Sequence, residues 1–285
     1  MKQTLFKRSL APLLVLVAML AARQVGAADF QAKVQADIKV FRDFFAARFP
    51  DVKFADYANG VYAIDADACQ QWKEIEEFPP YSIAVEEGKA LFEKPFANGK
   101  TYTAYFQNGG VVRQNYPFYD EKKGTVVTLE MAINECRVAN GEKPLEYKSA
   151  DLAKLSAYMA FISRGKPVDV KVASGGAYKA FMKGKEFFYA KRGQLNMSCA
   201  NCHMKYAGGW VRSEILSPAL GHTTHFPVFR SKWGEIGTLH KRYGGCSDNI
   251  GAKSFAAQSE EYRNLEFFET IMSNGLSFNG PASRK

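Results

Sequence analysis

The sequence predicts a mainly α-helical protein in which one small helical unit occurs twice. Long stretches carry apolar residues at three- and four-residue steps, as amphipathic helices do. Short sequence patterns also recur in the same order in two parts of the chain, which indicates an internal repeat. Between these parts lies a Gly/Pro/Val stretch without helical period, residues 165–176. We expect this stretch to be the linker between the units.

The N-terminus is expected to be a secretory signal peptide, residues 1–27. MKQTLFKRSL carries three positive charges, APLLVLVAMLAA is apolar, and small residues precede the expected cleavage after Ala27. The apolar run is too short to cross a bilayer, which needs about 20 residues. We therefore expect a periplasmic protein without a membrane anchor after cleavage, in a compartment where disulfides form and persist.

The charge of the chain does not indicate nucleic-acid binding. The 285 residues carry a net charge of +9, and loss of the four basic residues of the signal peptide leaves +5. Such a mild positive balance favours an acidic protein partner instead.

Three segments have the pattern of long helices. Residues 30–49 are amphipathic with a helical period. Residues 149–165 and 259–275 both start at a serine that is suited to an N-cap and stop at a glycine. These residues are Ser149 and Gly165 in one segment and Ser259 and Gly275 in the other.

Four pairs of patterns define the repeat. They are GKALF (88–92) with GKEFF (184–188), YPFYD (116–120) with FPVFR (226–230), TLEMAINEC (128–136) with TLHKRYGGC (238–246), and FISRG (161–165) with IMSNG (271–275). The first pair is expected to open similar helices. The second, third and fourth patterns follow one another at the same intervals in both parts of the chain. This agreement predicts one unit at residues 28–168 and a second at residues 169–285.

The second unit contains the motif Cys199-Ala200-Asn201-Cys202-His203. C-x-x-C-H is the pattern of c-type haem attachment, in which both thiols bond to the haem and the histidine becomes the proximal iron ligand. Zinc sites usually bring a second ligand pair, and a thioredoxin-type motif needs a βαβ context that this helical sequence lacks. We therefore expect one covalently bound c-type haem.

The first unit has lost this motif. Thr103, Phe106 and Gln107 stand where the second unit has its two cysteines and histidine, and Phe106 with Tyr105 is expected to fill the space. The predicted fold class is therefore mainly α, with tandem cytochrome c-like domains, the first degenerate and haem-free and the second haem-bearing.

Cysteine counting assigns the remaining thiols. Cys136 occupies the place of Cys246 in the first unit, and without a haem it can form a disulfide with Cys69. This bond would close a loop of roughly 70 residues and stabilise the unit by about 4 kcal/mol. Cys246 is left unpaired and is expected to be the distal iron ligand. The alternatives are His222, His225, His240 and Met272, and His222 with His225 is at most a weak metal motif.

These pieces together resemble the SoxA family of c-type cytochromes from bacterial thiosulfate oxidation. The resemblance is carried by SCANCH (198–203), RYGGC (242–246), LEMAINECR (129–137) and residues 259–285. It implies an enzyme that joins thiosulfate to a cysteine of the carrier protein SoxYZ. Electrons would pass through the haem to the small cytochrome SoxX and to a soluble cytochrome c.

The resemblance also implies the site residues. Cys246 would be both the distal ligand and the catalytic thiol, often as a persulfide, and Arg242 would bind the thiosulfate anion. Because the haem motif is missing at Thr103, Phe106 and Gln107, the chain resembles the single-haem branch of the family.

The residue chemistry near Cys246 agrees with this role. Thiosulfate is a dianion, and the guanidinium of Arg242 offers paired donors to its oxygens. Lys241 adds positive charge that favours a thiolate, while Gly244 and Gly245 either open room for substrate or form a simple turn.

Other functions stay open at this point. Arg242 could equally serve as a haem-propionate partner or a surface charge. The chain could be a thiosulfate dehydrogenase that forms tetrathionate, or a pure electron-transfer cytochrome in which Cys246 only ligates iron.

Overall fold

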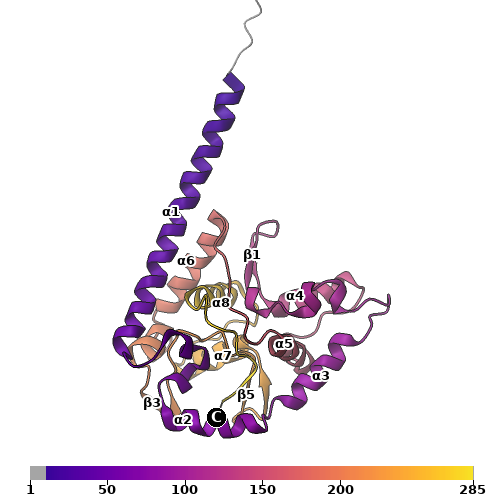
Figure 1. Cartoon of the computed structure of the whole chain (residues 1–285), viewed down its shortest axis with the longest axis vertical. Coiled ribbons are helices and arrows are strands. Elements are labelled where there is room, and N and C mark those ends of the chain that lie inside the picture. Colours follow the sequence, from indigo (N-terminus) through magenta and orange to yellow (C-terminus); the bar gives the residue numbers. More distant parts are fainter. Residues whose placement is uncertain (1–10, 285) are drawn as a thin grey trace, which may run out of the picture.

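The structure is a computed structural model that describes the backbone of residues 11–284 and the side chains of residues 29–284. Helices dominate and the strands are short, which confirms the predicted mainly α class (Figure 1). Residues 1–10 of the expected signal peptide lie outside the described residues. Within the described part, no helix has an apolar stretch of the length and hydropathy that a bilayer crossing requires.

Eight α-helices are described: α1 Ala11–Arg48, α2 Ala66–Glu77, α3 Ser82–Glu93, α4 Leu129–Ala139, α5 Ala150–Ile162, α6 Gly175–Tyr189, α7 Leu239–Asn249 and α8 Glu260–Met272. The described strands are β1 Phe118–Asp120, β2 Thr125–Val127, β3 Trp210–Val211, β4 Glu214–Ile215, β5 Val228–Arg230, β6 Glu235–Gly237 and β7 Ala282–Arg284. β1–β2, β3–β4 and β5–β6 are antiparallel pairs, and β7 adds to β5 in parallel. A short π-helical turn, η5 Asn201–Lys205, holds the end of the C-x-x-C-H motif.

The same order of elements occurs twice. From the hairpin β1–β2 to helix α5, each element begins 110 residues before its counterpart in β5–β6, α7 and α8. The capping signals hold in both copies, because Ser149 accepts a hydrogen bond from the Leu152 amide and Ser259 from the Tyr262 amide. Gly165 and Gly275 follow the two helices at φ 77° and 85°, in the left-handed region that favours glycine.

A glycine marks the tightest helix crossing in each copy. A Cβ on Gly88 of α3 would lie 2.1 Å from the Lys154 carbonyl oxygen in α5, and one on Gly184 of α6 would lie 2.0 Å from the Asn264 carbonyl oxygen in α8. Both glycines therefore let two helix backbones touch. The patterns GKALF and GKEFF do not open their helices as expected, since they lie in the later parts of α3 and α6.

We expect Gly184→Ala to lower the melting temperature strongly. The new methyl group must push a helix backbone aside, and overpacking of this kind costs about 1–3 kcal/mol or more. Gly175→Ala is the matched control, because its Cβ would meet nothing within 4 Å at the start of the same helix. Thermal unfolding followed by circular dichroism measures both variants, and equal melting temperatures would contradict the close crossing.

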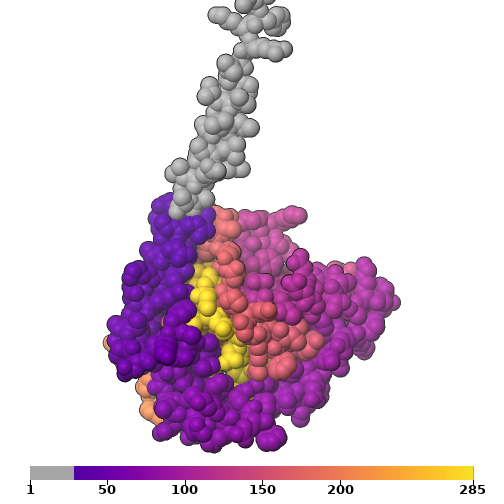
Figure 2. Space-filling model, in the orientation of Figure 1, coloured from indigo at the N-terminus to yellow at the C-terminus, as the bar shows by residue number. Residues whose placement is uncertain are grey.

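Helix α1 packs on helices α6 and α8 of the second unit. Phe41 lies 6.0 Å from Phe188 of α6 and 6.2 Å from Phe268 of α8, measured between ring centroids. Figure 2 shows the indigo N-terminal segment beside the salmon and yellow residues of that unit. Part of this helix lies within the predicted first unit, residues 28–168, yet its apolar side chains contact helices far along the chain.

The expected linker is part of the core. Val168, Val170 and Val172 are each at most 4% exposed, as period-2 side chains of an extended segment can be. The Val168 amide donates to the Leu276 carbonyl at 2.9 Å, and the Gly275 amide donates to the Val168 carbonyl at 2.8 Å. Residues 165–170 thus pair with the chain that follows α8, which joins the two units tightly.

A buried ion pair also crosses between the units. Arg113 of the first unit lies 3.3 Å from the Glu266 carboxylate in α8, and both side chains are at most 2% exposed. The other oxygen of Glu266 lies 3.1 Å from His240 Nε2 in α7. Burial opposes ionisation of Glu266, but its hydrogen bond with His240 and the charge of Arg113 outweigh this effect and lower its pKa. The first unit therefore supplies a charge to the core of the second.

Candidate haem and thiol site

The predicted proximal histidine is oriented by a backbone carbonyl. His203 Nδ1 donates a hydrogen bond of 2.9 Å to the Ser217 carbonyl oxygen, which makes Nε2 the ring nitrogen that can bind a metal. Burial lowers the pKa of His203 to about 3, with smaller contributions from His222 and Arg242. The imidazole therefore stays neutral, which is the form that binds a metal.

Three cysteines converge beside this histidine. Burial raises the pKa of Cys199, and the nearby Glu269 and Cys246 raise it further. Burial and Cys246 likewise raise the pKa of Cys202, while Arg242 lowers it. The structure thus brings Cys246 close to both thiols of the C-x-x-C-H motif, although it lies more than 40 residues away in sequence.

Helix α7 carries the other two predicted site residues. Arg242 and Cys246 are four positions apart in this helix, so they lie on one face. Gly244 and Gly245 are in the interior of the helix and do not form a turn. Helix-interior glycine costs roughly 1 kcal/mol relative to alanine, and a Cβ at either position would meet nothing closer than 3.9 Å. Packing within the chain therefore does not require these glycines, and they leave open space beside Cys246.

These observations fit a c-type haem. The site has the groups that a c-type haem needs. These are two free thiols, a neutral histidine with an available Nε2, and a third thiol beside an open helix face. Cys199 and Cys202 would hold the haem covalently, with His203 and Cys246 at the iron.

Arg242 is half-shielded and only loosely paired. Its Nη2 lies 3.8 Å from Glu214 Oε2, and its side chain is 24% exposed. Glu214 makes its close contact with Arg230 instead, at 2.5 Å. Burial opposes ionisation of Glu214, but the bond with Arg230 and the charges of Arg230 and Arg242 lower its pKa. An anion can therefore reach Arg242. Glu214 could not be predicted as its neighbour, because it lies on the separate strand β4.

The alternative distal ligands have other contacts. His222 Nε2 is 3.0 Å from Ser217 Oγ, and its Nδ1 is 3.0 Å from Glu269 Oε1. His240 accepts from the Gln258 amide and lies against Glu266, Met272 is 1% exposed in the core, and His225 is buried. In the part of the chain that the structure describes, no three His, Cys, Asp or Glu side chains form a metal-binding group.

Glu269 is a site residue that sequence reasoning missed. Its carboxylate accepts hydrogen bonds from Tyr243 of α7 and from His222. Burial raises the pKa of Glu269 to about 7, although the bond from Tyr243 acts in the other direction. A weak signal was the polar pair Tyr243 and Glu269 at positions that are Ile133 and Met159 in the first unit.

The predicted disulfide between Cys69 and Cys136 is absent, and both thiols are free. Cys69 lies in α2, which packs against β7, whereas Cys136 lies in α4, which packs against α5. Figure 1 shows α2 and α4 well apart. Cysteine counting failed here because α2 does not pack on α4. Burial raises the pKa of Cys136 to about 11, so it is an inert core thiol.

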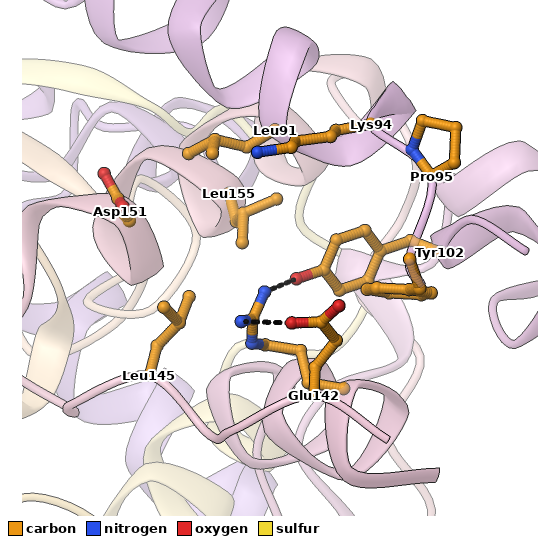
Figure 3. Close-up of a pocket in the computed structure, with 10 residues that line it drawn as sticks. Leu91, Lys94, Pro95, Tyr102, Glu142, Leu145, Asp151 and Leu155 are labelled. Atoms are coloured by element: carbon orange, nitrogen blue, oxygen red, sulfur yellow. Dashed lines mark hydrogen bonds and ion pairs between the residues drawn. The ribbon is translucent and has the colours of Figure 1, made fainter. Parts of the chain in front are cut away.

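Aromatic side chains fill the first unit. Phe106 is 3% exposed and stacks on Tyr102, as expected, but Tyr105 is 42% exposed and does not fill the core. A pocket of about 200 Å³ lies in this unit, and Leu91, Tyr102 and Glu142 are among its lining residues (Figure 3). This volume is below the range of roughly 300–1,000 Å³ of small-molecule sites, so the pocket offers no room for a haem.

Comparison with known proteins places the chain among thiosulfate-oxidising cytochromes. The family described as SoxA/TsdA, cytochrome c domain, matches residues 87–168. The L-cysteine S-thiosulfotransferase subunit SoxA of Chlorobaculum tepidum is 66% identical, with full coverage of both chains. The protein of the same name from Allochromatium vinosum is 49% identical over 86% of this chain and 88% of its own.

The fold is similar to that of a solved structure. The crystal structure of SoxXA from P. pantotrophus matches with a TM-score of 0.69 and 29% identity, and the match covers 76% of this chain and 84% of the other. This match spans both units, whereas the family match, residues 87–168, lies entirely within the unit without the C-x-x-C-H motif.

Proposed function

The chain belongs to the SoxA family of L-cysteine S-thiosulfotransferase subunits, and on this premise we propose that Cys246 and Arg242 form its active site. The observation that carries the proposal is the convergence of Cys246 with both thiols of the haem-attachment motif, on a helix face that also presents Arg242. The protein is a cytochrome c-type transferase of thiosulfate oxidation.

Each residue has one task in this proposal. Arg242 holds the sulfonate oxygens of thiosulfate through its guanidinium. The outer sulfur of thiosulfate bonds to the sulfur of Cys246, and this S–S bond releases two electrons and the thiol proton. A bound haem supplies the one-electron acceptor for this oxidation. The cysteine of the carrier then attacks the outer sulfur, takes the thiosulfonate group and restores Cys246 by thiol–disulfide exchange.

Open access beside Cys246 supports transfer to a protein thiol. The helix-interior glycines Gly244 and Gly245 leave space that a carrier peptide can enter. The proposed partners are a SoxX-type cytochrome, in line with the SoxXA match, the carrier SoxYZ, and a soluble cytochrome c. The proposed location is the periplasm, after cleavage of residues 1–27.

Two assays test this function on the purified holoprotein. Pyridine haemochrome analysis is expected to give one haem per chain, since the first unit has Thr103, Phe106 and Gln107 in place of the motif. Incubation with thiosulfate, SoxX, oxidised cytochrome c and reduced SoxYZ is expected to add one thiosulfonate group to the carrier, as measured by intact mass.

Other outcomes would support the other functions. A haem ratio near two would contradict the haem-free first unit. Formation of tetrathionate without any change in carrier mass would support the thiosulfate dehydrogenase. Absence of both products would leave only electron transfer.

A further inference from the structure

A chain of hydrogen bonds runs from the proximal histidine to the helix of the distal cysteine. His203 donates to the Ser217 carbonyl, and the hydroxyl of the same serine bonds to His222. His222 then bonds to Glu269 in α8, and the Tyr243 hydroxyl of α7 donates to the second oxygen of that carboxylate. Glu269 is therefore the point where the two sides of the site meet.

Glu269 is unusually placed for a glutamate. Its side chain is 2% exposed, and no arginine or lysine is within ion-pair distance of it among the described residues. Burial of a carboxyl group is costly unless hydrogen bonds compensate. Glu269 would therefore destabilise the fold if it lost its hydrogen bonds with Tyr243 and His222.

The first unit shows that the fold itself does not need this group. In the matching helix pair α4 and α5, the residues 110 positions earlier are Ile133 for Tyr243 and Met159 for Glu269. Both are fully buried in the apolar core of the first unit. The same two positions thus hold apolar side chains in the unit without a haem motif. In the unit with the motif, they hold a hydrogen-bonded pair.

Tyr243 connects this contact to the proposed active site. It follows Arg242 directly and precedes Cys246 by three positions, so it is a neighbour of Cys246 on the helix surface. A hydrogen bond that fixes Tyr243 also fixes the rotation of α7 and hence the direction of the Cys246 thiol.

We propose that Glu269 is a positioning residue that locks the proximal His203 and the Cys246 helix into one hydrogen-bonded unit. It acts through His222 and Ser217 on one side and through Tyr243 on the other. The inference rests on the proposed function, because it takes His203 and Cys246 as the two iron ligands.

The test uses the full-length holoprotein with the variants Glu269→Gln and Tyr243→Phe. Glu130→Gln is the matched control, because Glu130 is a buried glutamate of the same helix pair in the first unit and accepts from Ser156 at 2.7 Å. Each protein is measured by electron paramagnetic resonance of the oxidised state, by redox titration and by thermal unfolding.

We expect Glu269→Gln and Tyr243→Phe to change the low-spin g-values or split the signal into two species, and to shift the midpoint potential. Glu130→Gln should lower only the melting temperature. If both test variants keep the wild-type spectrum and potential, Glu269 has a structural role at most and the inference is wrong. A wild-type signal without thiolate character would instead overturn the proposed ligand pair, and this inference with it.

Discussion

Cys246→Ala is expected to abolish thiosulfate transfer to the carrier. The proposed mechanism uses this sulfur as the atom that bonds to thiosulfate, and loss of a covalent nucleophile reduces turnover by a factor on the order of 10³ or more. No other cysteine can replace it, because Cys199 and Cys202 would be bonded to the haem, Cys136 is fully buried, and Cys69 lies in α2, outside the site. Turnover is measured as the mass increase of SoxYZ with time.

The same substitution is expected to change the haem spectrum. Because Cys246 is also the proposed distal ligand, its loss should remove the thiolate signature from the low-spin electron paramagnetic resonance signal. Cys69→Ala is the control, since this half-buried thiol lies in α2 and outside the site. Full carrier-dependent activity in Cys246→Ala, or an unchanged spectrum, would show that the catalytic thiol lies elsewhere.

Local signals in the sequence predicted the repeated helices and the residues that converge at the site. Serine caps and glycine stops are properties of short segments, and the structure has helices α5 and α8 where these signals fall. Likewise, the matching segments that contain Cys136 and Cys246 form helices α4 and α7. The C-x-x-C-H motif is also a short segment, and it led us to expect His203 as the proximal iron ligand. The chemistry of haem attachment fixes the residue spacing of this motif.

Long-range packing accounts for what the sequence did not show. Whether α1 covers the first or the second unit depends on contacts between residues about 150 positions apart, such as Phe41 with Phe188. The pairing of residues 165–170 with the chain after α8 is of the same kind. Glu269 was hidden because a glutamate in a helix pattern is ordinarily solvent-exposed, and only the fold reveals that it faces Tyr243 and His222.

The charges around Arg242 distinguish substrate binding from a simple surface role. Lys241, the adjacent residue, pairs with Glu235 and lies 4.9 Å from the centre of the Trp233 ring. Among residues 29–284, the one ion pair of Arg242 is the distant contact of 3.8 Å with Glu214. An ionic donor without a close partner, beside an open helix face and near Cys246, has free capacity to bind an anion.

Arg242→Ala is therefore expected to weaken thiosulfate use while it preserves the haem spectrum. Loss of a charge-assisted contact costs about 1.5–3 kcal/mol, which corresponds to roughly a ten- to hundredfold fall in kcat/KM for thiosulfate. Lys241→Ala is the matched control and should change kcat/KM by less than about threefold, as expected for an exposed ion pair. The rate of carrier modification at varied thiosulfate concentration measures both. An equal effect of the two variants would mean that only the general positive field matters, because a specific anion contact at Arg242 requires a larger loss there than one residue earlier in the same helix.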